Sequence, residues 1–380
     1  MGLKNLFSKK LSAPALKDRR SSIPDEGYAP VTRDTVAAID ELSRVVKNNP
    51  DAVEIYLALG NLYRSQGEIE RAVQIRQNLI VRPGLKKDFK AKAWYELGLD
   101  YKRGGFLDRA MGAFEQARSL SGDSDSIYTE MARLHAESGD FETAARHYSR
   151  LDSPVAEAHY LVRAAQAEMA AGNTSKGWKL ISRALKVNPG SPEARIEAMH
   201  QYMREGNWQQ VAVHMDEGLD QMPSDIAFVL PEGLLAYAIK HDVTGAGDGH
   251  GEPFRYKPAP ELADAVLPVL EKREQDLLLK FYAAWIASAR DLDKSRGMLE
   301  QTLMLSPGFW PARLELLAIG MQDQPLSPGF SKQLEFFIER ARHVKRFLCR
   351  QCGLKREQLF FICPRCHSRH SIGYRTLLNE

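Results

Sequence analysis

Four cysteines near the C-terminal end are the residues of this chain whose type and spacing suit chemistry. They are Cys349, Cys352, Cys363 and Cys366, and the 380-residue sequence contains no other cysteine. The spacing Cys-x2-Cys-x10-Cys-x2-Cys puts two thiol pairs on two tight turns that point at one centre. Four converging thiolates form the tetrahedral ligand set of Zn2+ or iron. The spacing therefore predicts one metal ion, zinc or iron, bound by all four cysteines.

Two disulfides or a thioredoxin-like redox pair are the alternative uses of these cysteines. The N-terminus shows no secretory signal, which predicts a reducing compartment, where Cys-x-x-Cys pairs more often bind metal than form structural disulfides. Neither alternative accounts for two matched pairs. Because cysteines fill all four positions, the site has no place for a catalytic water and is predicted to be structural. His367 and His370 flank it as expected bystanders.

The residues around the cysteines predict a small metal-dependent module over 346–380. Gly353 follows the first pair, where the turn favours a residue that tolerates a positive φ. Pro364 stiffens the second pair, and the apolar run 359–362 between the pairs predicts a short strand. A module of about 35 residues buries too little apolar surface to fold unaided, so the metal is expected to supply folding energy.

Long before the cysteines, the chain repeats a pattern of about 34 residues. The segments EIYLALGNLYRSQGEIERAV and KAWYELGLDYKRGGFLDRAM share an aromatic residue, Leu-Gly, Tyr, a turn glycine and Ala at equivalent places. That order is typical of tetratricopeptide repeats, in which small residues let two helices approach closely. The small residue of the second helix recurs at intervals of 34, 38, 34, 33 and 34 residues, at Ala38, Ala72, Ala110, Ala144, Gly177 and Val211.

These features predict an all-α protein, with a tetratricopeptide-type helical-hairpin solenoid over 31–345 and a rubredoxin-like, zinc-ribbon metal module over 346–380. Each hairpin buries its apolar face only against its neighbours, so the units are expected to stack into a superhelix. The Gly- and Pro-rich stretch 242–260 is predicted to be a flexible insertion. Beyond residue 225 the repeat phase weakens, and helical regions are expected at 226–241, 261–289, 293–305, 309–321 and 328–345.

Residues 1–30 are predicted to form a flexible basic tail. Leu3, Leu6, Phe7 and Leu11 share one face of a helix, so the tail is also a candidate amphipathic helix for an anionic membrane surface. No stretch approaches the ~18 consecutive apolar residues of a membrane-spanning helix. The expected location is the cytoplasm, with at most peripheral contact at the cytoplasmic face of the inner membrane.

Tetratricopeptide repeats followed by CRQCGLKREQLFFICPRC resemble the lipopolysaccharide assembly protein B (LapB) family. The matching features are the cysteine pairs with Gly353, the ten-residue interval, and the aromatic pair Phe360–Phe361. The resemblance implies a metal module packed on the repeats and an adaptor that works with a membrane AAA+ protease. In that family, the adaptor controls turnover of the deacetylase that commits to lipid A synthesis. The family also has an N-terminal membrane helix, which this sequence does not match, and usually a tryptophan where this chain has Arg369.

Under the adaptor hypothesis, the solenoid binds a partner protein or peptide in its concave groove. Any single polar residue of the groove is explained equally well as an ordinary solvated position. The repeat phase places candidate groove residues on the first helices of the units, at Asn61, Arg64, Asp100, Lys102, Arg133 and Arg163.

Two other functions are alternatives. From Arg340 onward, ten basic residues are opposed only by Glu357 and Glu380, so the module is a candidate nucleic-acid binder. The bases of a bound nucleic acid would stack on Phe360 or Phe361. The phosphates of the nucleic acid would contact Arg350, Lys355, Arg356, Arg365 and Arg369. A rubredoxin-type electron carrier with iron on four thiolates is the other alternative. The sequence contains no His-Glu-x-x-His, nucleophile elbow or P-loop, so we expect no enzyme.

Overall fold

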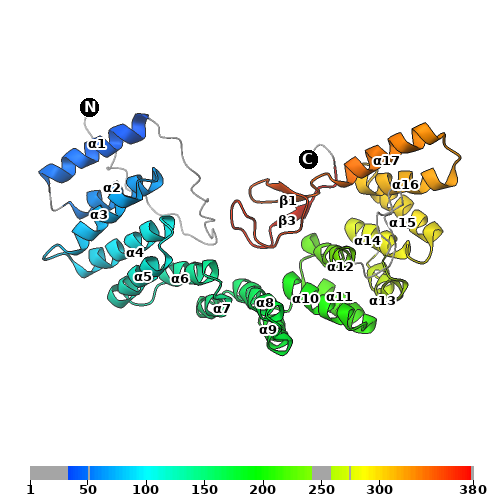
Figure 1. Cartoon of the computed structure of the whole chain (residues 1–380), viewed down its shortest axis with the longest axis horizontal. Helices are drawn as coiled ribbons and strands as arrows, with labels where there is room; N and C mark the ends of the chain where they lie inside the picture. Colours follow the sequence, from blue (N-terminus) through cyan, green and yellow to red (C-terminus); the bar gives the residue numbers. More distant parts are fainter. Residues whose placement is uncertain (1–32, 50–51, 242–257, 274, 378–380) are drawn as a thin grey trace.

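The computed structural model describes residues 33–49, 52–241, 258–273 and 275–377. In these ranges, antiparallel helix pairs stack side by side into a wide arc, and a small β-module lies inside the arc (Figure 1). The helices are α1 (Arg33–Asn48), α2 (Val53–Ser65), α3 (Ile69–Ile80), α4 (Lys87–Arg103), α5 (Leu107–Ser121), α6 (Asp125–Glu137), α7 (Phe141–Arg150), α8 (Pro154–Ala170), α9 (Thr174–Val187), α10 (Pro192–Arg204), α11 (Trp208–Gln221), α12 (Val229–Lys240), α13 (Pro260–Glu271), α14 (Leu277–Ala287), α15 (Leu292–Leu305), α16 (Trp310–Asp323) and α17 (Pro328–Arg342), with a 3-10 turn η2 (Ser224–Ile226) before α12.

The stacked hairpins are the tetratricopeptide-type solenoid that the sequence predicts. Even-numbered helices from α2 to α14 lie on the inner side of the arc, and their odd-numbered partners lie on the outer side (Figure 1). Among the described helices, none is long and apolar enough to cross a membrane. The predicted tail 1–30 lies outside the described residues, as does the predicted insertion except for 258–260.

Small residues set the close approach of the two helices in each hairpin. A Cβ atom at Gly98 of α4 would stand 2.6 Å from the Phe114 ring of α5. Ala72 and Ala110, the predicted small residues of α3 and α5, are completely buried. The predicted turn glycine Gly105 has a φ of 77°, a backbone conformation that L side chains rarely adopt. The repeat pattern therefore reports real packing contacts.

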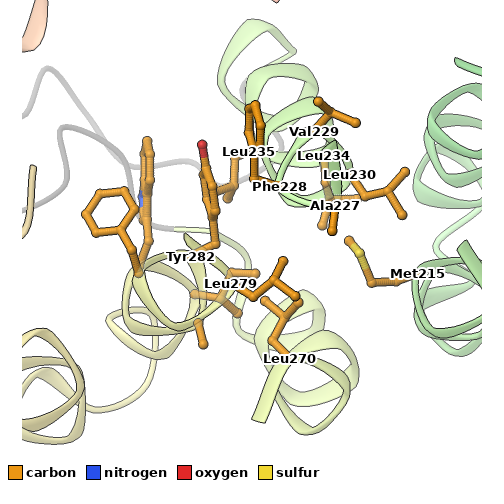
Figure 2. Close-up of a cluster of buried hydrophobic side chains, with 14 of the residues drawn as sticks. Met215, Ala227, Phe228, Val229, Leu230, Leu234, Leu235, Leu270, Leu279 and Tyr282 are labelled. Carbon is orange, nitrogen blue, oxygen red and sulfur yellow. The ribbon is translucent and has the colours of Figure 1, made fainter. Parts of the chain in front are cut away.

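The C-terminal half keeps the same architecture although the chain is interrupted there. Helix α13 packs against α11 and α14, and α12 packs against α10, so α13 continues the outer row of helices and α12 continues the inner row. Figure 2 shows Phe228 and Leu235 beside Tyr282 of α14, with Met215 of α11 and Leu270 of α13 in the same apolar cluster. The predicted insertion 242–260 therefore falls between an inner and an outer helix of the array.

The predicted helical region 261–289 is two helices, α13 and α14. The Asp276 carboxylate accepts hydrogen bonds of 2.9 Å from the backbone N–H groups of both Leu278 and Leu279. A side-chain oxygen in this position satisfies the free N–H groups at the start of a helix. Asp276 therefore starts α14 as a new helix, packed antiparallel to α13.

The β-module is a three-stranded antiparallel sheet with strand order β2-β1-β3. Its strands are β1 (Phe347–Cys349), β2 (Lys355–Arg356) and β3 (Ile372–Tyr374). The prediction of a strand at 359–362 is wrong, because that segment pairs locally across the second cysteine turn. There the N–H of His370 donates to the carbonyl of Phe361 (2.8 Å), and the N–H of Cys363 donates to that of Ser368 (2.9 Å).

Candidate metal centre

Two equivalent backbone turns carry the four cysteines. In the first, Gly353 has a φ of 70° and its N–H donates to the Cys349 carbonyl at 2.8 Å. In the second, His367 has a φ of 53° and its N–H donates to the Cys363 carbonyl at 2.9 Å. The positive φ expected at Gly353 is confirmed. Sequence reasoning missed that His367 occupies the matching position.

The four thiols converge on one point. Their sulfur atoms all lie within 4.8 Å of one another, and the shortest separations are 3.6 Å, for Cys349–Cys366 and for Cys352–Cys363. A tetrahedral ion with metal–sulfur bonds of about 2.3 Å would place its ligand sulfurs about 3.8 Å apart. All four cysteines are free thiols. The arrangement fits one tetrahedral metal ion, and His367 and His370 are outside the cluster, as predicted.

Two serines that sequence reasoning missed tune the sulfurs. The Ser371 hydroxyl lies 3.2 Å from the Cys349 sulfur, and the Ser368 hydroxyl lies 3.1 Å from the Cys366 sulfur. Burial opposes ionisation of Cys349, but hydrogen bonds from both serines lower its pKa to about 6. Burial raises the pKa of Cys363 to about 12. A metal ion bound at the centre would favour the thiolate form of all four cysteines.

The module shares a hydrophobic core with the inner face of the array. Phe347 of β1 is fully buried and stacks on Phe228, with ring centres 6.2 Å apart. Tyr374 of β3 packs edge-on against Phe228 at 5.6 Å and contacts Phe309 before α16 at 6.1 Å. Cys349 itself is completely buried within this core. The cysteine turns and the C-terminal repeats therefore share one buried core.

Arginines at every fourth position attach the end of the chain to acidic residues of the array, two of them buried. Arg346 pairs with Glu232 of α12 at 3.1 Å, and the same carboxylate accepts a 2.7 Å hydrogen bond from the Tyr282 hydroxyl. Burial opposes its charge, yet Glu232 holds the pKa of Arg346 above its ordinary value. Arg342 pairs with Glu315 of α16 at 2.8 Å, and Arg350 pairs with Asp225 of η2.

His370, a bystander to the metal, anchors the second cysteine turn to α10. Its Nε2 lies 2.9 Å from the buried Glu193 carboxylate, which also contacts His159 Nδ1 of α8 at 3.0 Å. Burial would raise the pKa of Glu193, but hydrogen bonds with His159 and His370 lower it to about 2. The neighbouring Arg369 lies over the Tyr148 ring of α7, with the guanidinium carbon 5.0 Å from the ring centre.

The residues proposed for nucleic-acid contact fall on different sides of the module. Arg350 and Arg369 face the array through Asp225 and Tyr148, and Phe360 is buried in the shared core. These three residues therefore do not form one continuous surface for a nucleic acid. Lys355, Arg356 and Arg365 line a hollow on the module's outer surface.

The predicted groove residues contact neighbouring array residues. Arg64 pairs with Asp100 at 2.8 Å and is hydrogen-bonded to Asn61 at 3.2 Å. Asp100 is completely buried, so its assignment to the groove surface is wrong: its carboxylate also faces the buried Arg76. The other candidates also have partners. Lys102 and Arg133 each pair with Glu130, and the Arg163 guanidinium lies over the Phe141 ring.

The stacked hairpins and the converging thiols define the class: a tetratricopeptide-repeat protein with a four-cysteine module at its C-terminal end. A tetratricopeptide-repeat family model matches residues 32–77. A solved tetratricopeptide repeat protein from Parabacteroides merdae aligns with 80% of this chain and 99% of its own, at a TM-score of 0.33 and 14% identity.

The relatives are more specific than this class. The chain is 23% identical to lipopolysaccharide assembly protein B of Escherichia coli K12, over 88% of this chain and 84% of the relative. It is 24% identical to the protein of that name from Haemophilus influenzae, over 84% of this chain and 78% of the relative. These relatives confirm the predicted resemblance to the LapB family.

Proposed function

We propose that this chain is a non-catalytic adaptor that acts in lipopolysaccharide assembly by binding partner proteins. The supporting observation is the way its concave face is divided. The C-terminal module occupies the inner face from α8 to the start of α16, through contacts with Glu193, Glu232 and Phe309. Helices α2, α4 and α6 continue the same inner face beyond the module (Figure 1). This N-terminal half is the proposed partner-binding surface.

The proposed partners are those implied by the family: a membrane AAA+ protease and the deacetylase of lipid A synthesis that it degrades. The chain would meet them at the cytoplasmic face of the inner membrane. In this proposal, Cys349, Cys352, Cys363 and Cys366 hold one structural Zn2+ or iron ion that keeps the module folded in its place. Elemental analysis distinguishes the metals, and a colourless, zinc-loaded protein would exclude the electron-carrier alternative.

Site-specific photo-cross-linking tests the partner-binding surface. A cross-linkable residue replaces Arg133 on inner helix α6, whose side chain is 39% exposed. The matched control places it at Gln116, an exposed position on outer helix α5. With the purified protease and deacetylase present, we expect cross-links from position 133 and none from position 116. Equal yields at both positions, or no cross-link to either protein, would contradict the proposal.

A further inference from the structure

Basic residues of the C-terminal segment form two sets with different surroundings. The first set faces the array, where Arg342, Arg346 and Arg350 each pair with an acidic residue. The second set lines a hollow of about 580 Å³ on the other side of the module. It consists of Lys345, Lys355, Arg356 and Arg365. Docking on the array accounts for the first set and leaves the second unexplained.

The second set brings more basic than acidic side chains to the hollow. Glu357 is the one acidic residue that lines the hollow, and its carboxylate already contacts His343 Nδ1 at 3.1 Å. Lys345, Arg356 and Arg365 make no ion pair with any described residue. Several cations gathered around one concavity repel one another and raise the local concentration of anions. The charge of the hollow is therefore complementary to an anionic ligand.

We propose that this hollow binds a phosphate group. The forked guanidinium groups of Arg356 and Arg365 match the geometry of phosphate oxygens, and the two lysines add point charges. The Gln358 amide, which also lines the hollow, offers a neutral donor. The volume is in the range of pockets for small ligands. This inference does not depend on the adaptor function, because the hollow lies in the metal module and not on α2, α4 or α6.

Two sources can supply such a phosphate: a soluble phosphate ester or the head group of an anionic phospholipid. Helix α17, which ends three residues before Lys345, exposes Phe330, Phe336 and Phe337 to solvent by 54%, 62% and 62%. The last helix of a repeat array ordinarily presents a polar outer face. Exposed aromatic rings combined with basic residues favour contact with anionic lipid surfaces. The two sources are separated experimentally.

The test uses the purified, metal-loaded full chain and two probes. One probe is vesicles of phosphatidylcholine with phosphatidylglycerol, assayed by flotation against phosphatidylcholine alone. The other is glycerol 3-phosphate, assayed by calorimetry. Replacing Arg356→Gln and Arg365→Gln should weaken binding about tenfold for each arginine removed. The matched control, Lys86→Gln with Lys87→Gln at the exposed start of α4, should bind like the parent protein.

Each outcome decides the proposal. Binding of either probe that is lost in the arginine variant, with metal content and helicity unchanged, supports it. Vesicle binding that also falls in Phe336→Ser with Phe337→Ser assigns the lipid source, and binding of glycerol 3-phosphate assigns the soluble one. Failure of the parent protein to bind either probe overturns the proposal, as does equal binding by the parent and the arginine variant. If the cations only balance the thiolate charge, the arginine variant loses metal and the parent binds neither probe.

Discussion

The N-terminal and C-terminal halves of the array satisfy their buried acids in different ways. Between α2 and α6 the partners come from the array itself: Asp100 pairs with Arg64 and Arg76, and Glu130 pairs with Lys102. From α10 to α16 partners also come from the end of the chain, whereas Glu157 of α8 still pairs with Arg183 of α9. There the acids and their partners are Glu193 with His370, Glu232 with Arg346, and Glu315 with Arg342.

This difference shows that only the N-terminal half is electrostatically complete as a repeat array. A buried carboxylate without a partner costs several kcal/mol, which is a large share of the stability of a domain. Without the module, Glu193 would lose its contact with His370 and Glu232 would lose its ion pair with Arg346. We therefore treat the four-cysteine module as part of the C-terminal half, and the following predictions test that view.

The largest effect is expected from removing the metal ligands. Replacing Cys349→Ser with Cys352→Ser should release the metal and unfold the module, because its own apolar core is small. Hydrogen exchange should then rise in α10–α16 and remain low in α2–α6. Elemental analysis must show the loss of one metal ion per chain. Unchanged metal content, or an equal rise in exchange in both halves, would contradict the comparison.

Replacing Glu232→Gln is expected to have the next largest effect. It removes the counter-charge of the half-buried Arg346 and weakens the hydrogen bond of the fully buried Tyr282, at a cost of about 2 kcal/mol in the free energy of unfolding. The matched change in the other half is Glu130→Gln, which touches Lys102 and Arg133, two partly exposed cations. That change should cost about 1 kcal/mol. Urea unfolding measures both, and equal costs would remove the distinction between the halves.

Mild acid should weaken the C-terminal half through His200 of α10. Burial lowers the pKa of His200 to about 4, although its Nε2 donates a 3.1 Å hydrogen bond to the Gly233 carbonyl. An unfolded histidine has a pKa near 6.5, so below that pH the unfolded chain binds the proton first and stability falls. The expected slope is about 1 kcal/mol per pH unit between pH 6.5 and 5.5. In His200→Asn, the urea midpoint should depend less on pH across this range. An unchanged pH dependence would exclude His200 as the cause.

The smallest effect is expected from Arg369→Ala. The guanidinium of Arg369 lies over Tyr148 and Tyr160, and one exposed or half-buried cation–π contact contributes about 0.5–1 kcal/mol. Thermal unfolding should show a small loss of stability that Arg369→Lys partly restores. Arg365→Ala, on the outer surface of the module, serves as the control and should leave the melting temperature unchanged. A larger loss of melting temperature in Arg365→Ala than in Arg369→Ala would contradict the assigned orientation of the module.

Local patterns were sufficient for the repeats and for the metal site. Small residues recur at the positions of Gly98 and Ala110 because the two helices of a hairpin touch there. The same packing constraint applies to each repeat unit. The cysteine spacing is likewise local, since each pair lies on one turn. Such features are encoded within a few residues, and neighbouring units or turns repeat them.

The attachment of the module could not be predicted in the same way. The pairing of Arg346 with Glu232 depends on the curvature of the whole array, which no short segment specifies. The four-residue spacing of Arg342, Arg346 and Arg350 was a visible signal, but that spacing normally indicates one face of a helix. Here the helix ends at Arg342 and the next residues enter a strand. The left-handed backbone of His370, with a φ of 49°, was also not foreseeable from its residue type.

The folded-back C-terminus has a consequence for how the protein is made. Most contacts of a repeat array join neighbours, so such arrays can fold unit by unit from any starting point. The contact of Arg346 with Glu232 spans 114 residues, and that of His370 with Glu193 spans 177. During synthesis, α2–α6 have all their partners soon after they emerge from the ribosome, whereas α10 and α12 must wait for the last residues of the chain. We therefore expect the C-terminal half to complete its folding late, only once the end of the chain is available.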